Sequence, residues 1–367
     1  MQDLGEATGA LIALFGREGY ARLEPPILQP ADVFLDLSGE DIRRRMFVTQ
    51  DATGAELCLR PEYTIPVCRH HRATRGTEPA AYAYCGPVFR LRAGETGEFL
   101  QAGIESIGRS DATAADAEIL ALALEGLQAV GAGPVSVRLG DMGLLDAVIE
   151  ALRLPATAKR RVMRAVVSGR GLAGLTGSEG GASPEHAGLL AALEGQAPQA
   201  ARAFVEDVLS IAGITTVGGR SAGEIAERFL ERAANRSGLV PEEARTVLTR
   251  YLGIAGDPDG AAVAVRSLAR EAGLDLEAAL AAFEERVGFM AARGLDVGAF
   301  GFRADFARNL DYYTGFIFEA HAPGHEKPLV GGGRYDRLLR HLGAPEPTPA
   351  VGCAFWLDRI AAVETGR

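Results

Sequence analysis

Residues 308–335 constrain the fold of this chain more than any other stretch, and they read RNLDYYTGFIFEAHAPGHEKPLVGGGRY. Within them, residues 316–319 (FIFE) show the period-two alternation of a β-strand. The segment APGHEKP predicts a turn that returns the chain as a second strand. Three consecutive glycines at 331–333 allow a ligand or another backbone to approach closely. The stretch therefore predicts a hairpin beside a small-molecule pocket, although a glycine run alone also fits an ordinary hairpin with a loose return loop.

Periodic patterns outside this stretch predict an α+β protein. Apolar residues recur at helical spacing over 5–18, 65–75 and 114–130. Alternating patterns predict a hairpin over 46–59, with the turn sequence DATG, and further strands at 82–92, 101–108 and 134–141. We therefore expect a mostly antiparallel sheet flanked by helices.

The composition changes after Leu154 and predicts three parts. A Gly/Ser-rich loop, GSEGGASPE, is followed by helices rich in Ala, Leu, Glu and Arg, and β-patterned sequence returns near Phe300. We expect a core in two parts, residues 1–154 and 300–367, with an inserted, mainly helical domain over 155–299.

Charge and composition argue against several classes of protein. With 38 basic and 48 acidic residues, the chain has a formal charge of −10, so we expect no nucleic-acid partner. The densest basic cluster, Lys159–Arg161 with Arg164, fits a solvated helix face. No apolar run is long enough to span a bilayer and the N-terminus is not signal-like, so we expect a cytoplasmic protein with no membrane contact. The four cysteines lack metal-site spacing, and we expect neither a metal nor disulfides.

Two short patterns place polar side chains together. In an extended segment Glu62 and Thr64 would share one face and could receive an ammonium group. On the strand at 101–108, Gln101 and Glu105 would share a face, with Gly103 leaving room between them.

The histidine pair His70 and His71 lies in the basic helix expected at 65–75. No carboxylate or metal-spaced partner accompanies the pair, so we expect ordinary surface roles for both residues.

Five ordered elements resemble the core of class II aminoacyl-tRNA synthetases, and most closely histidyl-tRNA synthetases. They are LRPEYT, GPVFR followed by FLQAGIE, RNLDYYTGFIFE, GGGRYD and AVGCAFWLDR. The resemblance covers roughly residues 1–150 and 300–360 and implies a class II synthetase-like antiparallel sheet with flanking helices. The segment EPPILQPADVF resembles the signature that lies at the family's dimer interface, which implies a homodimer.

Carried over position by position, the resemblance implies a site for free histidine. Glu62 and Thr64 would hold the ammonium group, and Arg90 and Gln101 would face the carboxylate. Arg308 matches an arginine near that carboxylate. The imidazole would be read by Glu105, Tyr312 and Tyr313.

Departures from the synthetase pattern affect the ATP and tRNA elements rather than the amino-acid site. Arg92 stands where the synthetases have an acidic residue, and the loop AGETGE that follows is short. Trp356 replaces the small glycine beside the position of adenine, just before Arg359. Asn309 and Tyr63 replace two further glycines, and the chain ends at Arg367, so we expect no anticodon-binding domain.

This combination resembles the histidyl-tRNA synthetase-like regulatory subunits of ATP phosphoribosyltransferase. The resemblance implies no catalytic residue and no cofactor, and it implies partnership with a short-form catalytic subunit in a hetero-octamer. It further implies feedback inhibition by histidine in the first step of histidine biosynthesis.

Three alternatives stay open at this point. The first is an active histidine-activating ligase, such as a truncated histidyl-tRNA synthetase, against which Trp356 and Arg92 argue. The second is a sensor of uncharged tRNA, which the acidic composition disfavours. The third is an asparagine-synthetase-like use of the core, which the imidazole-reading set disfavours.

Overall fold

The computed structural model describes residues 4–37, 44–76, 78–92, 94, 96–169, 172, 216–217, 220–221, 240–308 and 312–365. By internal packing the chain divides into two units, one of residues 1–151 with 250–367 and one of residues 152–249. Described elements of the smaller unit include α7 (Ala156–Val167), β8 (Thr216–Val217) and β9 (Arg220–Ser221), and α11 (Glu242–Leu252) crosses its C-terminal boundary. The expected loop GSEGGASPE lies outside the described residues.

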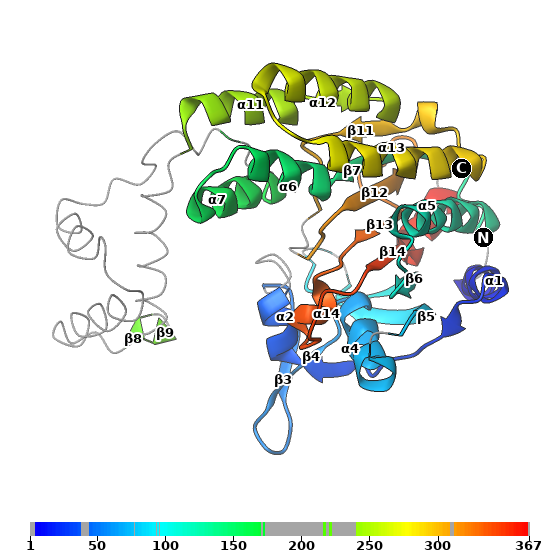
Figure 1. The fold of residues 1–367 in the computed structure, drawn as a ribbon. Coiled ribbons are helices and arrows are strands. Elements are labelled where there is room, and N and C mark those ends of the chain that lie inside the picture. The colour runs from blue at the N-terminus through cyan, green and yellow to red at the C-terminus, as the bar shows by residue number, and fades with distance from the viewer. Residues whose placement is uncertain are drawn as a thin grey trace. The chain divides into compact units, whose positions relative to one another are not determined.

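One mixed sheet forms the centre of the larger unit, and the described residues supply nine strands to it. Neighbouring strands run antiparallel except in the pairs β1–β5 and β7–β11, which are parallel. This confirms the predicted antiparallel sheet, whose middle strands lie side by side in Figure 1. In spatial order the strands are β1 (Ala21–Arg22), β5 (Ala80–Phe89), β6 (Glu98–Ile107), β14 (Ala350–Trp356), β13 (Val330–Arg334), β12 (Phe316–His321), β7 (Ser136–Asp141), β11 (Gly301–Arg303) and β10 (Ala255–Gly256).

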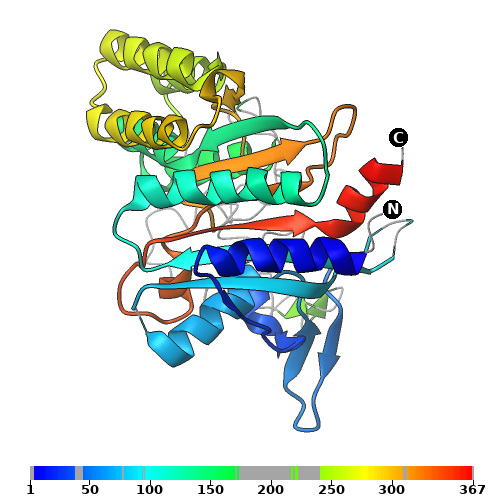
Figure 2. The ribbon, with the colours of Figure 1, turned by 90° about the vertical axis from the view of Figure 1, so that its right-hand side faces the viewer.

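Helices cover one face of this sheet. Figure 2 shows α1 (Leu4–Arg17) and α5 (Ala112–Ala129) lying next to each other in front of the sheet and running along its strands. Phe15 of α1 packs on Phe355 of β14 with ring centroids 5.9 Å apart. Helix α1 ends before Gly19, whose φ of +85° favours glycine and turns the chain toward β1.

Helix α13 (Glu277–Ala292) packs on α5, and α12 (Pro258–Ala272) packs on α13. These contacts group residues 250–299 with the larger unit, although the sequence pattern assigns them to the inserted segment. A helical insertion over the whole of 155–299 stays a prediction.

A second apolar core covers the other face of β5, β6 and β14. It is built from a three-stranded sheet, β2 (Leu28–Pro30), β4 (Glu56–Leu59) and β3 (Val48–Gln50), and from the helices α2 (Ala31–Leu37), α4 (Thr64–Arg75) and α14 (Leu338–His341). Strands β3 and β4 form the hairpin predicted over 46–59. Asp51 stabilises its turn by accepting hydrogen bonds from the amides of Thr53 (2.8 Å) and Ala55 (3.0 Å).

The surface role expected for His71 is wrong. Helix α4 turns this residue inward, where it is fully buried and its Nδ1 lies 3.1 Å from the Tyr82 hydroxyl. His70 is exposed, as expected.

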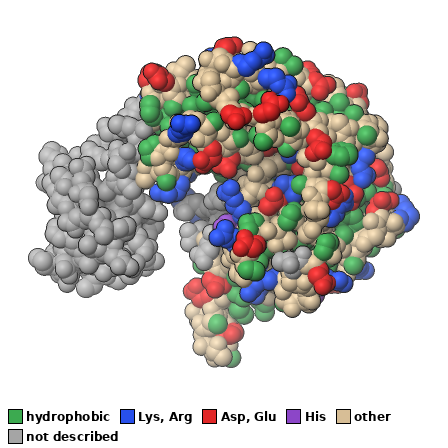
Figure 3. Space-filling model, viewed as in Figure 1, with side chains coloured by type: hydrophobic (Ala, Val, Ile, Leu, Met, Phe, Trp, Pro, Cys, Tyr) green, Lys and Arg blue, Asp and Glu red, His purple; other side chains and the backbone are tan. Residues whose placement is uncertain are grey.

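Several smaller elements complete the described chain: α6 (Met142–Ala151), the 3-10 helix η2 (Val297–Ala299) and α15 (Leu357–Thr365). None of the helices in the described ranges is long and apolar enough to cross a membrane. On the face shown in Figure 3, acidic and basic side chains of the described residues are interspersed rather than gathered by sign.

Candidate functional site

The site begins as a row of small residues across three neighbouring strands. Strand register places Gly103 of β6, Ala354 of β14 and Gly331 of β13 side by side, with Tyr84 at one end of the row and Glu319 at the other. Paired residues of neighbouring strands point to the same face of a sheet. The phenol of Tyr84 occupies the space above Gly103 and the guanidinium of Arg308 that above Gly331, and a cavity of about 240 Å³ lies along the row and is lined by Ala354 and Gly331.

All eight residues predicted for histidine binding meet at this cavity. Seven of them line it: Glu62, Thr64, Arg90, Gln101, Arg308, Tyr312 and Tyr313. The eighth, Glu105, is 1% exposed and is hydrogen bonded to the lining residue Thr64. The structure thus brings the set together, while its role in binding histidine stays a prediction.

Glu105 is surrounded by hydroxyl groups. Its Oε1 accepts hydrogen bonds from Thr64 Oγ1 at 2.8 Å and from the Tyr84 hydroxyl at 3.3 Å, and its Oε2 accepts one from Tyr335. Among the described residues no cation forms an ion pair with it. Burial raises the pKa of Glu105 to about 8, and the hydrogen bonds from Tyr335 and Thr64 oppose that rise. The residue is therefore a buried carboxyl group without its own counter-charge, and it is mostly protonated at neutral pH.

The prediction that Glu62 and Thr64 share one extended segment is wrong, because helix α4 begins at Thr64. Its carboxylate accepts hydrogen bonds from the amides of Thr64 (2.6 Å) and Ile65 (2.9 Å), two groups that the first turn of a helix leaves unpaired. Burial raises the pKa of Glu62, while these hydrogen bonds and the charge of Arg90 lower it. The start of the helix, rather than strand alternation, brings Glu62 and Thr64 to the cavity.

Arg90 lies close to Glu62 and is held by the segment that carries it. Its Nε donates to the carbonyl oxygen of Pro61 at 2.6 Å, and its guanidinium carbon lies 5.6 Å from the ring centroid of Phe99. Burial lowers the pKa of Arg90 to about 10, opposed by the charge of Glu62, so this arginine remains a cation at neutral pH.

A cationic end of the cavity is formed around Trp356. Its ring centroid lies 4.4 Å from the guanidinium carbon of Arg359 and 5.7 Å from that of Arg308. Arg308 Nη1 donates to the carbonyl oxygen of Phe318 at 3.1 Å, and its guanidinium occupies the space that a side chain at Gly331 would take.

The glycine run lies in the central strand β13 and not in a loose return loop. A side chain at Gly332 would overlap the backbone of β14, and one at Gly333 would overlap that of β12. The glycines therefore serve close packing of Arg308 and of the neighbouring strands.

Three residues that line the cavity carry a buried polar atom without a hydrogen-bond partner among the described residues. The atoms are Oε1 of Gln101, an acceptor, Nε1 of Trp356, a donor, and the hydroxyl of Tyr63. Gln101 and Trp356 are paired across β6 and β14, and both line the cavity. Because an unpaired buried polar group costs about 1–3 kcal/mol, such atoms indicate a place where a polar ligand completes the bonding.

Comparison with known proteins agrees with this geometry. The family model for histidyl-tRNA synthetase matches residues 2–214 and 223–360. An ATP phosphoribosyltransferase regulatory subunit from Mesorhizobium japonicum is 44% identical over 95% of this chain and 95% of its own length. One from a Chelativorans species is 42% identical over 96% of both chains. The chain belongs to the family of ATP phosphoribosyltransferase regulatory subunits.

The fold of this regulatory-subunit family member has a solved counterpart. An ATP phosphoribosyltransferase regulatory subunit/histidyl-tRNA synthetase from Bacillus halodurans superposes with a TM-score of 0.69 at 21% identity, covering 99% of this chain and 81% of that one. The match supports the class II synthetase-like fold predicted from the sequence.

Sequence reasoning missed three residues that border the site: Tyr84, Glu319 and Tyr335. Alternation along β5 indicated an inward face for Tyr84, and alternation along β12 separated Glu319 from the apolar Phe316 and Phe318. For Tyr335 no local signal exists, because its partner Glu105 is 230 residues away in the chain.

Proposed function

We propose that this chain is a non-catalytic regulatory subunit that binds free histidine in the cavity and assembles with a short-form ATP phosphoribosyltransferase catalytic subunit. In this role it is required for catalysis by its partner in the first step of histidine biosynthesis, in the cytoplasm. Histidine in the cavity then inhibits the assembly. The proposal rests on the family membership and on the composition of the cavity.

One observation supports the proposal most strongly: the cavity matches a small zwitterion and not a nucleotide. Its volume of about 240 Å³ lies below the roughly 300–1,000 Å³ of pockets for drug-sized ligands. Trp356, which is 6% exposed and stacked on Arg359, fills the end where a synthetase would need room for adenine.

The lining carries both cations and hydrogen-bond acceptors, as a zwitterion requires. We assign the ligand carboxylate to Arg90, Arg308 and the donating side-chain NH2 group of Gln101. We assign the ammonium group to Glu62 and Thr64.

The imidazole is assigned to Glu105, Tyr312 and Tyr313. Tyr312 and Tyr313 pack on each other with centroids 5.0 Å apart, and burial raises the pKa of Tyr313 to about 12, so it stays a phenol at neutral pH. Phenols and a carboxyl group together offer donors and acceptors to the two ring nitrogens.

Regulation requires that histidine bind two arrangements of the assembly with different affinity. A coupling free energy of about 1–3 kcal/mol corresponds to roughly 5- to 150-fold changes in affinity. We further propose a homodimer within a hetero-octamer, for which the segment EPPILQPADVF offers exposed Ile27 and Leu28, 42% and 50% accessible.

The test mixes the purified chain with a short-form catalytic subunit and follows phosphoribosyl-ATP formation with and without histidine. We expect no activity from the chain alone, a rise on mixing and suppression by histidine. A mixture no more active than the catalytic subunit, together with histidine-dependent pyrophosphate exchange by this chain, would instead identify a ligase.

A further inference from the structure

A buried network of charged residues lies under the helical face of the sheet. At its centre is Asp116 of α5, whose side chain is fully buried. Asp116 accepts hydrogen bonds from Arg286 Nε of α13 at 2.7 Å and from Arg334 Nε of β13 at 2.8 Å. Arg286 also donates to Asp141, at the end of β7, at 2.5 Å. The network therefore joins two helices to two strands.

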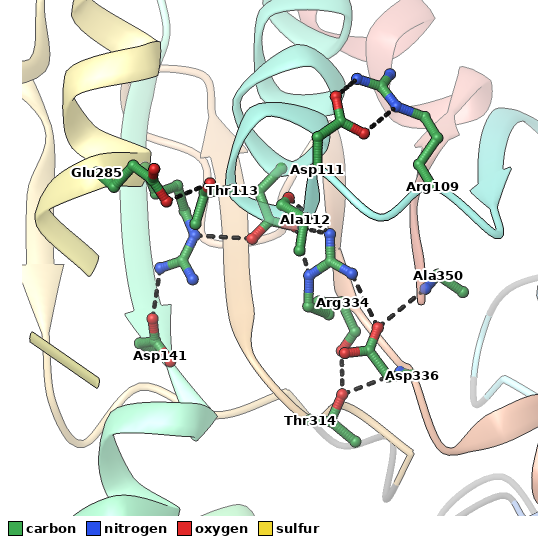
Figure 4. A network of polar contacts seen from close by, with 12 residues as sticks. Arg109, Asp111, Ala112, Thr113, Asp141, Glu285, Thr314, Arg334, Asp336 and Ala350 are labelled. Carbon is green, nitrogen blue, oxygen red and sulfur yellow. Dashed lines mark hydrogen bonds and ion pairs between the residues drawn. The ribbon is translucent and has the colours of Figure 1, made fainter. Parts of the chain in front are cut away.

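The network continues to the segments that carry the phenols of the pocket. Arg334 Nη1 donates to Asp336 Oδ1 at 2.9 Å, and the same oxygen accepts the amide of Ala350 at 2.9 Å. The Asp336 amide donates to Thr314 Oγ1 at 3.0 Å, and the Thr314 amide donates to the Arg334 carbonyl at 2.8 Å. Figure 4 shows Arg334, Asp336 and Thr314 in this arrangement.

These contacts fix the backbone on both sides of Tyr335 and on the C-terminal side of Tyr312 and Tyr313. Tyr335 lies between Arg334 and Asp336, and its hydroxyl reaches Glu105 on the pocket side. Thr314 directly follows Tyr312 and Tyr313, which line the cavity. The two segments are tied to each other through Thr314, so a shift of one displaces the other.

We propose that Thr314 and Asp336 are positioning residues for histidine binding: with Arg334 they anchor Tyr312, Tyr313 and Tyr335 to the buried Asp116. The proposal rests on the proposed function of the cavity. It assigns a binding role to residues that do not line the cavity, and it makes histidine affinity depend on contacts that reach α5 and α13.

The test uses Thr314→Val, which keeps the shape of the side chain and removes the acceptor of the Asp336 amide. Histidine is titrated into the folded protein, and binding is read from the fluorescence of Trp356, the only tryptophan of the chain and a lining residue. We expect the affinity to fall about 5- to 10-fold, the effect of one lost hydrogen bond at a positioned group. Thr314→Ser retains the hydroxyl and should restore the affinity to within about twofold.

The matched control is Thr113→Val. Thr113 Oγ1 donates at 2.8 Å to Glu285 in an exposed contact, and Figure 4 shows these two residues beside the network. This control should bind histidine like the wild type.

The outcomes separate the two proposals. If the wild type shows no response to histidine by fluorescence or calorimetry, the proposed function of the cavity fails. If the wild type binds and Thr314→Val binds equally well, or if Thr314→Ser is as weak as Thr314→Val, the positioning role fails and the histidine site stands.

Discussion

Two carboxylates are buried on opposite sides of the same sheet, and their surroundings differ. Asp116, on the helical side, is held between the guanidinium groups of Arg286 and Arg334. Glu105, on the pocket side, is held by the hydroxyls of Thr64, Tyr84 and Tyr335 and has no ion-pair partner among the described residues. A buried charge with full pairing contributes to a defined structure, whereas a buried carboxyl group without a counter-charge takes up a proton or is held at a cost that a ligand can offset.

The same contrast appears in how fully other polar side chains are hydrogen bonded on the two sides of the sheet. On the pocket side, Gln101 Oε1 and Trp356 Nε1 lack partners among the described residues. On the helical side, Arg334 bonds to Asp116, to Asp336 and to the carbonyl oxygen of Ala112 at 2.8 Å. We infer that the paired groups on the helical side stabilise the fold, and that the unpaired groups on the pocket side bind a ligand.

The largest effect is expected where the pairing is complete. Asp116→Asn removes the charge between two buried arginines and should lower the free energy of unfolding by about 3–5 kcal/mol, measured by urea denaturation. The matched control is Asp111→Asn, which loses a pair with Arg109 at 2.6 Å in which the Asp111 side chain is 55% exposed. That change should cost about 0–1 kcal/mol. Equal losses in both variants would contradict the distinction.

The pH dependence of stability should reveal the unpaired carboxyl group. The folded-state pKa of Glu105 is about 8, raised from an ordinary value of 4.5, so between these values the folded chain holds a proton that the unfolded chain has lost. Its contribution to stability therefore falls as pH rises, by about 1.4 kcal/mol per pH unit, until it levels off near pH 8.

Glu105→Gln cannot titrate at this position and lacks that contribution. The measurement compares urea unfolding of the two ligand-free proteins at pH 5.5 and pH 7.5. Wild type should lose more stability than the variant between these two values. The same pH slope in both would show that Glu105 is not buried in protonated form.

The smallest effect on stability is expected for Gln101→Leu. The change removes an acceptor that has no partner among the described residues, so the free energy of unfolding should change by less than about 1 kcal/mol. Histidine affinity should nevertheless fall, because the side-chain NH2 group that we assign to the ligand carboxylate is removed as well. A variant that is strongly destabilised would show that Gln101 supports the fold and is not reserved for a ligand.

The sequence predicts those parts of the site that depend on local periodicity. Alternation along β6 correctly places Gln101 and Glu105 on one face, and the hairpin of β12 and β13 follows from its turn and strand patterns. These features arise within about twenty residues, so they are visible in a single sequence.

Other parts depend on strand register between distant segments. Arg334 and Asp116 are 218 residues apart, and nothing in either local pattern indicates their ion pair. Glu62 and Thr64 were predicted to share an extended segment before a helix at 65–75, whereas α4 begins one residue earlier, at Thr64, and its cap position is Tyr63 rather than Ser, Thr, Asn or Asp. Long-range pairing and an unusual cap therefore account for what the sequence alone did not predict.

The most direct test of the contrast between the two sides is a calorimetric titration of histidine into the wild type, Glu105→Gln and Asp111→Asn. If the pocket side is built around Glu105, wild type and Asp111→Asn should bind alike. Glu105→Gln should then bind about 1–3 kcal/mol more weakly, roughly 5- to 150-fold. Unchanged affinity in Glu105→Gln would contradict the assignment of this cavity as the histidine site.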